Sequence, residues 1–144
     1  MSAPLSLNVA GIPDALRREH RWFVWRYQWD DKNRRIKKPL GKSNDPSTWL
    51  SFEQAITLYR RGGWDGLVFA LGDGWGGGDL DHCCHDGAAI FNGATAIIER
   101  FGCYYEVSPS GTGFKLFFRC GRVGFQLDFT TMQFTRWQSP RCSP

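Results

Sequence analysis

Alternating apolar and polar residues near the N-terminus predict a pair of β-strands. Phe23, Trp25, Tyr27 and Trp29 recur at every second position, with Arg26 and Gln28 between the last three. This period of two places the aromatic side chains on one face of a strand over residues 22–29. A polar turn follows at residues 30–33, and residues 34–39 form the return strand. The pattern therefore predicts a hairpin.

Apolar residues at helical spacing follow this hairpin. They are Phe52, Ala55, Ile56 and Tyr59. Ser51, with Glu53 and Gln54 just after it, is typical of a helix start. The pair Gly62-Gly63 would end the helix. A shorter helix is expected earlier, over residues 14–20, because Pro13 suits a first-turn position.

The rest of the chain predicts more strands around a second helix. A short strand at residues 66–71 leads through a glycine-rich stretch, residues 72–78, into Asp79-Leu80-Asp81. A helix is expected over residues 88–101, and strands over residues 104–108, 114–119 and 123–129. The buried side of this helix would carry Ile90, Ala94, Ile97, Ile98 and Phe101. The order predicts an α+β fold with a mixed, mostly antiparallel sheet and flanking helices.

The length of 144 residues suits one domain. We place it at residues 13–137, after a flexible lead-in (residues 1–12) and before a tail (residues 138–144). No signal segment or bilayer-spanning apolar run is evident, so a cytoplasmic protein without membrane contact is expected. Five cysteines without a secretion signal favour free thiols.

Positive charge is concentrated in the first third of the chain. Ten of the 18 basic residues lie between Arg17 and Lys42, against Glu19, Asp30 and Asp31. Interleaved with aromatic residues, this segment is compatible with a nucleic-acid or nucleotide surface. An equally good interpretation is a solvated hairpin whose charges keep it soluble.

Asp79 and Asp81 are the first candidates for chemistry. Two carboxylates two residues apart on a strand share a face, and paired carboxylates are suitable ligands for Mg²⁺ or Mn²⁺. The alternative is a turn in which the carboxylates cap backbone amides. Leu80 between them favours the strand. The neighbouring His82-Cys83-Cys84-His85 cluster does not favour zinc, because no second Cys/His pair occurs.

A second candidate segment runs from Ser108 to Lys115. Its hydroxyls, Gly111 and Gly113 and the Lys115 ammonium could hold phosphates, or could form a polar hairpin loop. Lys115 would share a strand face with Phe117 rather than with Leu116.

These segments form an ordered series. It comprises Lys37-Lys38-Pro39, then Asn44-Asp45-Pro46-Ser47-Thr48-Trp49, then residues 51–55, then Gly78-Asp79-Leu80-Asp81-His82, and finally Glu106-Val107-Ser108-Pro109-Ser110-Gly111-Thr112-Gly113. The series resembles the N-terminal catalytic domain of phage and plasmid primase-polymerases, a branch of the archaeo-eukaryotic primase superfamily. The resemblance covers about residues 13–119.

The resemblance implies template-directed nucleotide addition in the replication of a mobile element. Asp79 and Asp81, with Asp128 as the late acidic residue, would be catalytic and bind two Mg²⁺ or Mn²⁺ ions. The residues implied in nucleotide binding are Ser108, Ser110, Gly111, Thr112 and Lys115, and those implied in nucleic-acid binding are Arg26, Lys37 and Lys38. The implied partners are nucleoside triphosphates, a DNA template and primer, and a separate helicase, because larger members carry a helicase region downstream.

The C-terminal part departs from this family pattern. Asp128 is the only acidic residue after Glu106, and its surroundings match the family poorly. A stand-alone or C-terminally truncated catalytic core is expected. The alternative is a catalytically weak or inactive primase-like domain that binds nucleotides or nucleic acid.

Overall fold

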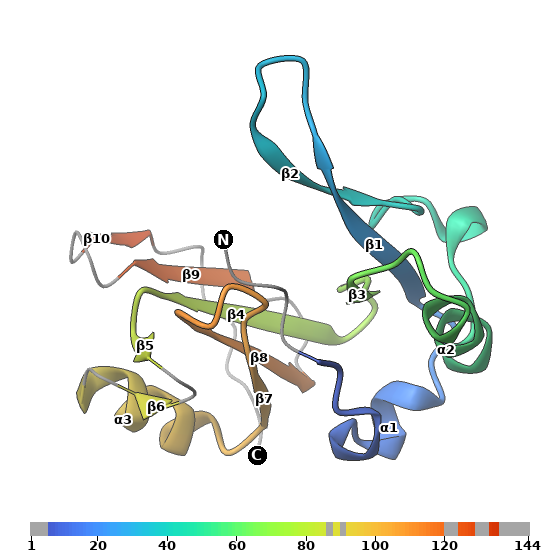
Figure 1. The fold of residues 1–144 in the computed structure, drawn as a ribbon. Helices are drawn as coiled ribbons and strands as arrows, with labels where there is room; N and C mark the ends of the chain where they lie inside the picture. Colours follow the sequence, from blue (N-terminus) through green and yellow to red (C-terminus); the bar gives the residue numbers. More distant parts are fainter. Residues whose placement is uncertain (1–5, 86–87, 90–91, 120–123, 129–132, 136–144) are drawn as a thin grey trace. The chain divides into compact units, whose positions relative to one another are not determined.

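The chain divides into two compact units, residues 6–70 and the residues from 71 onward. The computed structural model describes residues 6–85, 88–89, 92–119, 124–128 and 133–135 (Figure 1). The predicted tail at residues 138–144 and Ile90 lie outside these ranges. Each unit combines strands with helices, so the predicted α+β class is confirmed.

The first unit is a three-stranded antiparallel sheet with a helix beside it. Its strands are β1 (Trp22–Trp29), β2 (Arg35–Pro39) and β3 (Gly66–Phe69), in the order β2-β1-β3. Its helices are η1 (Val9–Gly11), α1 (Asp14–Arg17), η2 (Pro46–Thr48) and α2 (Phe52–Arg60). The predicted hairpin is therefore confirmed, with β1 at the predicted bounds.

Helix α2 begins where its capping residues predict. The Ser51 side chain accepts a hydrogen bond from the amide of Gln54, and the Gln54 side chain accepts one from the amide of Ser51. These reciprocal bonds satisfy two amides that the helix cannot pair internally. The buried face includes Phe52, whose ring centroid lies 5.1 Å from that of Trp22 on β1.

The second unit is a five-stranded mixed sheet with one longer helix. Its strands are β4 (Trp75–Asp81), β7 (Tyr104–Val107), β8 (Phe114–Arg119), β9 (Gly124–Asp128) and β10 (Gln133–Thr135), in the order β10-β9-β4-β8-β7. Only the pairing of β4 with β9 is parallel among these described strands. The short strands β5 (Cys84–His85) and β6 (Ala88–Ala89) form a separate pair.

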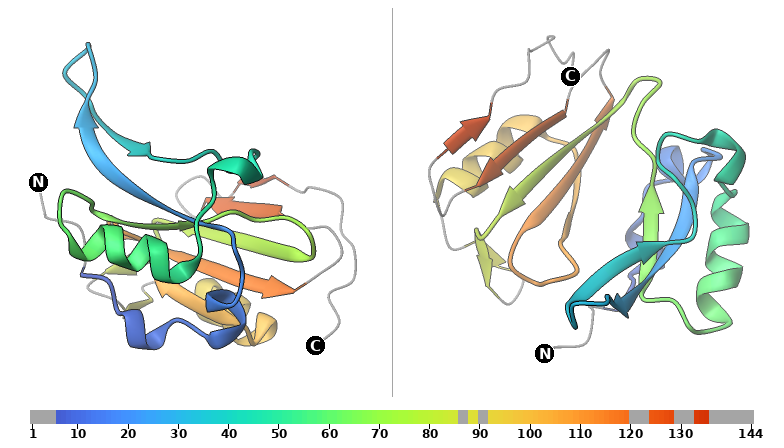
Figure 2. Two further views of the ribbon diagram at one scale, coloured as in Figure 1. Left: turned by 90° about the vertical axis from the view of Figure 1, so that its right-hand side faces the viewer. Right: turned by 90° about the horizontal axis from the view of Figure 1, so that it is seen from above.

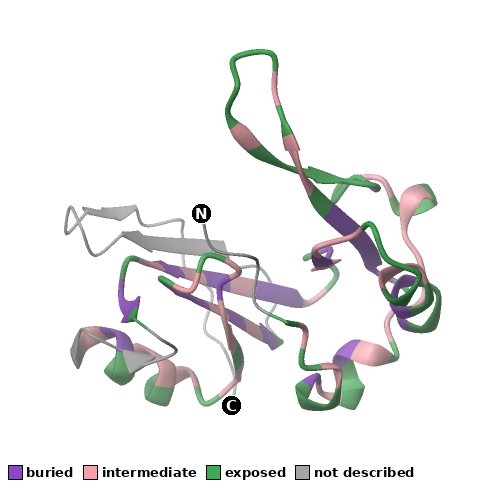
Figure 3. Cartoon of the chain, viewed as in Figure 1, coloured by how far each residue is buried: buried purple, intermediate pink, exposed green. Residues whose placement is uncertain are grey.

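Helix α3 (Asn92–Phe101) packs against one face of this sheet (Figure 2). The core contains Leu80, Cys83, Cys84, Ala94, Phe114, Leu116 and Phe118, with Ile97, Ile98 and Phe101 packed against it. The predicted buried side of the helix is thus confirmed at the described positions. The predicted start at residue 88 is wrong, because residues 88–89 pair with β5 as strand β6 and the helix begins at Asn92. Burial is coloured in Figure 3, where the middle strands of this unit carry most of its buried residues. Within the described residues, no helix is both long and apolar enough to cross a membrane.

Candidate functional site

Strand β4 holds Asp79 and Asp81 on the face of the sheet opposite the core. Burial alternates along the strand, and Leu80 between the two aspartates has no exposed surface. Both aspartates are half-buried. The expected strand geometry is therefore confirmed, and the two carboxylates share one face.

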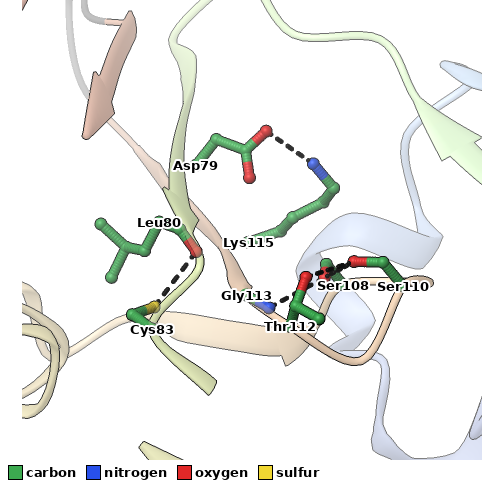
Figure 4. A network of polar contacts seen from close by, with 8 residues as sticks. All are labelled: Asp79, Leu80, Cys83, Ser108, Ser110, Thr112, Gly113 and Lys115. Carbon is green, nitrogen blue, oxygen red and sulfur yellow. Dashed lines mark hydrogen bonds and ion pairs between the residues drawn. The ribbon is translucent and has the colours of Figure 1, made fainter. Parts of the chain in front are cut away.

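Lys115 lies directly beside Asp79 on the neighbouring strand. The antiparallel register pairs these two residues, and Lys115 Nζ lies 2.8 Å from Asp79 Oδ2. Figure 4 shows the two side chains pointing toward one another. About a third of each side chain is exposed (33% for Lys115 and 36% for Asp79). Solvent therefore screens this pair only in part.

The other carboxylate oxygen of Asp79 is without a partner. Asp79 Oδ1 is buried and makes no hydrogen bond within the described part of the chain. A buried charged oxygen left unsatisfied is costly. A divalent cation or a hydrogen-bond donor at this position would remove that cost, so the residue fits the metal ligation that the sequence predicts.

Asp128 is placed by the backbone of β9. The parallel register pairs its Cα with that of Asp81, and neighbouring strands lie about 4.8 Å apart. The third candidate acidic residue is therefore next to the second along the hydrogen-bonding direction of the sheet. The side chain of Asp128 lies outside what the structure describes.

The loop between β7 and β8 is built by its own hydroxyls. Ser108 is buried (6% exposed), and its Oγ accepts a hydrogen bond from the amide of Gly113 at 3.1 Å. Ser108 Oγ and Ser110 Oγ lie 2.9 Å apart, as do Ser110 Oγ and Thr112 Oγ1 (Figure 4). Ser110 and Thr112 are exposed. The predicted hairpin loop is present, and two of its three hydroxyls are open to a ligand.

The two glycines of this loop serve different purposes. Gly111 has a φ of 76°, in the region that glycine adopts readily. Gly113 has a packing constraint instead, because an added Cβ would clash with the Leu80 carbonyl oxygen. Gly113 thus permits close contact between the loop and β4.

Backbone hydrogen bonds attach this loop to the end of β4. The Thr112 carbonyl accepts hydrogen bonds from the amides of Cys83 and Cys84, at 2.9 and 3.0 Å. His82, just before them, has a φ of 54°. The segment after Asp81 therefore turns back onto the loop of residues 108–113, which we call the hydroxyl loop. The two motifs that the sequence singled out thus lie side by side and form one candidate site.

Glu106 belongs to the same site, although sequence reasoning assigned it no role. The register pairs Glu106 on β7 with Lys115, so Glu106, Lys115 and Asp79 form a row across three strands. Tyr104 Oη donates a hydrogen bond to Glu106 Oε2 at 3.3 Å. A signal that could have found Glu106 is its position two residues after Tyr104, in a strand that pairs with the strand of Lys115.

Burial raises the pKa of both Glu106 and Tyr104. It raises the pKa of Glu106, although the hydrogen bond from Tyr104 and the charge of Lys115 oppose this shift. Burial is also the main cause that raises the pKa of Tyr104 to about 12, with contributions from the charge of Glu106 and the hydrogen bond to it. Tyr104 is therefore a hydrogen-bond donor at neutral pH.

The residues implied in nucleic-acid binding lie in the first unit. Arg26 is on β1, and Lys37 and Lys38 are on β2. The register pairs Arg26 with Lys38 and Tyr27 with Lys37. Successive residues of a strand face opposite sides, so Lys37 lies on one face of the hairpin and Arg26 and Lys38 on the other.

Neither the arrangement of metal-ligating side chains nor the comparisons with known proteins assign a function independently. Within the described ranges, which leave out the Asp128 side chain, no group of three or more His, Cys, Asp or Glu residues is placed to hold a metal ion. Comparison of the sequence with protein-family models and with curated proteins finds no match.

Proposed function

We propose that the second unit is the catalytic part of a primase-polymerase-type nucleotidyltransferase. One observation carries the proposal: Asp79 and Asp81 share a strand face, and the backbone bonds of Thr112 to Cys83 and Cys84 attach the hydroxyl loop beside them. This arrangement combines a carboxylate pair with hydroxyl donors and a lysine. Such a set suits a nucleoside triphosphate bound with divalent cations.

Each residue has a role in the proposal. Asp79, Asp81 and Asp128 would hold Mg²⁺ or Mn²⁺, which when bound neutralises phosphate charge and lowers the pKa of a primer 3′-hydroxyl. Ser110 and Thr112 would donate hydrogen bonds to phosphate oxygens, and Lys115 would supply a positive charge. Ser108 would support the loop from within. Arg26, Lys37 and Lys38 would contact the template or primer.

The ion pair of Lys115 with Asp79 also supports a second candidate function. Lys115 already supplies a positive charge to one of the proposed metal ligands. A domain that binds nucleotides without joining them would retain such a pair. This candidate predicts triphosphate binding without nucleotide incorporation.

Primer extension distinguishes the two candidates. The purified chain is supplied with a primed single-stranded template, nucleoside triphosphates and Mg²⁺ or Mn²⁺, and product length is measured. Under the proposal, Asp79→Asn and Asp81→Asn each abolish extension. Asp73→Asn is the matched control, because Asp73 is an exposed residue in the turn before β4, and it should retain the rate.

Two results would count against the catalytic proposal. Extension that persists in both site variants would show that these carboxylates are not catalytic. Triphosphate binding by a wild-type chain that makes no product with either metal would favour the non-catalytic candidate.

A further inference from the structure

The hairpin of β1 and β2 extends beyond the third strand of its sheet. Strand β1 pairs with β3 only from Trp22 to Trp25, whereas it pairs with β2 from Trp25 to Trp29. Asp65 ends the first pairing. Its amide donates to the Trp25 carbonyl at 2.8 Å, and its Oδ2 accepts from the Tyr27 amide at 2.6 Å. From Arg26 onward the structure is a two-stranded ribbon (Figure 1).

One face of this ribbon alternates aromatic rings with cations. The register pairs Tyr27 with Lys37 and Trp29 with Arg35, and these four residues share a face. Arg35 Cζ lies 3.6 Å from the centroid of the Tyr27 ring. Lys37 Nζ lies 5.0 Å from the centroid of the Trp25 ring, deeper along the same face. We call Tyr27, Trp29, Arg35 and Lys37 the aromatic–cationic strip.

The strip is open to solvent. Trp29 is 59% exposed, and Figure 3 shows the outer part of the hairpin coloured exposed or intermediate throughout. Tryptophan is usually well buried in folded proteins. An exposed indole beside a guanidinium and an ammonium group is therefore typical of a binding surface.

Charge complementarity indicates an anionic partner. Residues 26–38 contain six basic residues, namely Arg26, Lys32, Arg34, Arg35, Lys37 and Lys38, against Asp30 and Asp31. Asp30 is occupied within the turn, where its carboxylate accepts hydrogen bonds from the Arg34 side chain and from two backbone amides. The hairpin therefore presents a net positive charge.

The mixture of rings and cations favours a single-stranded nucleic acid among anionic partners. Unpaired bases stack on aromatic rings and on guanidinium planes, while phosphates meet cations. In a duplex the bases stack on one another, which leaves no base face for Trp29. We infer that the aromatic–cationic strip binds single-stranded nucleic acid, with a base stacked on Trp29 and phosphates at Arg35 and Lys37.

This inference extends the proposed function, and its test is independent of catalysis. The full chain is titrated against a fluorescent oligothymidylate of about 15 nucleotides, within the length range of single-strand binding sites. The buffer contains neither divalent metal nor nucleoside triphosphate. Loss of extension in the catalytic assay and loss of binding in this assay are thus separate results.

Substitutions of Trp29 test directly whether a base stacks on this ring. Trp29→Ala should weaken binding about 5- to 150-fold, the usual value of one stacked base. Trp29→Phe keeps a ring and should restore most of the affinity. Leu40→Ala is the matched control, because Leu40 is an exposed apolar residue (57% exposed) just beyond the paired residues of the ribbon, and it should bind as the wild type does.

Salt dependence tests the cations separately. Lys37→Ala should lower the slope of log affinity against log salt by about 0.7, the value for one phosphate of a single strand. Lys42→Ala removes the same charge from an exposed position outside the ribbon and should leave the slope unchanged. An equal effect of both variants would mean that only overall charge matters, and would overturn the strip as a site.

Competing ligands complete the test. Oligouridylate and oligothymidylate are both single strands, and their relative affinity tells whether RNA or DNA is preferred; binding of either supports the inference. A duplex that binds as tightly as the single strand would overturn it. Binding to vesicles of anionic phospholipid without binding to either oligonucleotide would also overturn it, as would unchanged affinity in Trp29→Ala.

Discussion

Lys115 and Asp79 occupy directly paired positions on adjacent antiparallel strands, and their charged atoms lie 2.8 Å apart. The same ammonium group therefore both stabilises the Asp79 carboxylate and competes with any cation for it. In the proposed site this relationship would change on ligand binding. A metal ion would take the carboxylate, and a phosphate would take the ammonium.

Replacing Lys115 should therefore shift two affinities in opposite directions. In Lys115→Gln we expect Mn²⁺ to bind up to about fivefold more tightly, because a partly exposed ion pair contributes about 1 kcal/mol at most. The same variant should bind nucleoside triphosphate more weakly. Isothermal titration calorimetry measures both, with Arg100→Gln at an exposed position of α3 as the control. Weaker Mn²⁺ binding in Lys115→Gln would contradict the competition.

The hydroxyls of the loop should separate into structural and ligand-binding groups. Ser108→Ala leaves the Gly113 amide without its buried acceptor, so we expect a loss of about 1–3 kcal/mol in the free energy of unfolding. Ser110→Ala removes an exposed hydroxyl and should change stability by less than about 0.5 kcal/mol, while it weakens triphosphate binding. Urea unfolding and nucleotide titration of both variants measure this. Equal destabilisation by the two substitutions would contradict the division of roles.

Gly113 should tolerate no side chain. In Gly113→Ala the new Cβ would clash with the Leu80 carbonyl oxygen. Because that oxygen is a backbone atom and a Cβ is held rigidly by its own backbone, the loop must move away from β4. We expect a loss of about 2–3 kcal/mol in stability, at the upper end for overpacking, together with weaker triphosphate binding. Urea unfolding gives the first value.

Gly111→Asn is the matched control for this substitution. Gly111 has a positive φ, but nothing lies within 4 Å of an added Cβ, and asparagine tolerates this backbone region. Its cost should be about 1 kcal/mol, at the lower end for an L-residue in this region. A larger cost for Gly111→Asn than for Gly113→Ala would mean that loop conformation, rather than the approach to Leu80, limits the site.

Local periodicity was sufficient to predict most elements of this fold. The alternation at residues 22–29 and 114–119 matches β1 and β8 at the observed bounds, and the apolar spacing after Ser51 matches the buried face of α2. These signals depend on residues close in sequence. The short strands β5, β6 and β10 have too few residues to show a period, and sequence reasoning did not find them.

The sequence did not allow us to predict how strands that are distant along the chain pair with one another. Nothing in residues 123–129 indicates that β9 runs parallel to β4 with Asp128 beside Asp81, because register depends on the packing of the whole sheet. The same holds for the hydroxyl loop. Its three hydroxyls are alike in sequence, and only the fold buries Ser108 while it exposes Ser110 and Thr112.

Glu106 should make the stability of the protein depend on pH. Burial raises its pKa in the folded state above the ordinary value of 4.5, so the folded chain keeps a proton over a range of pH in which the unfolded chain has lost it. Stability must then fall as the pH rises from about 4.5 through the folded-state pKa, and this decline ends above that value. Glu106→Gln cannot ionise, so it should lack this part of the decline.

Urea unfolding midpoints measured at intervals from about pH 4 to pH 8 test this expectation. The advantage of Glu106→Gln over the wild type should grow across the range and then become constant. Glu99→Gln, at an exposed position of α3, removes the same charge and should keep the wild-type decline. Tyr104→Phe removes the hydrogen bond that lowers the pKa of Glu106, so the decline should extend to higher pH. If Glu106→Gln and Glu99→Gln follow the same curve, the burial of Glu106 does not control this pH dependence.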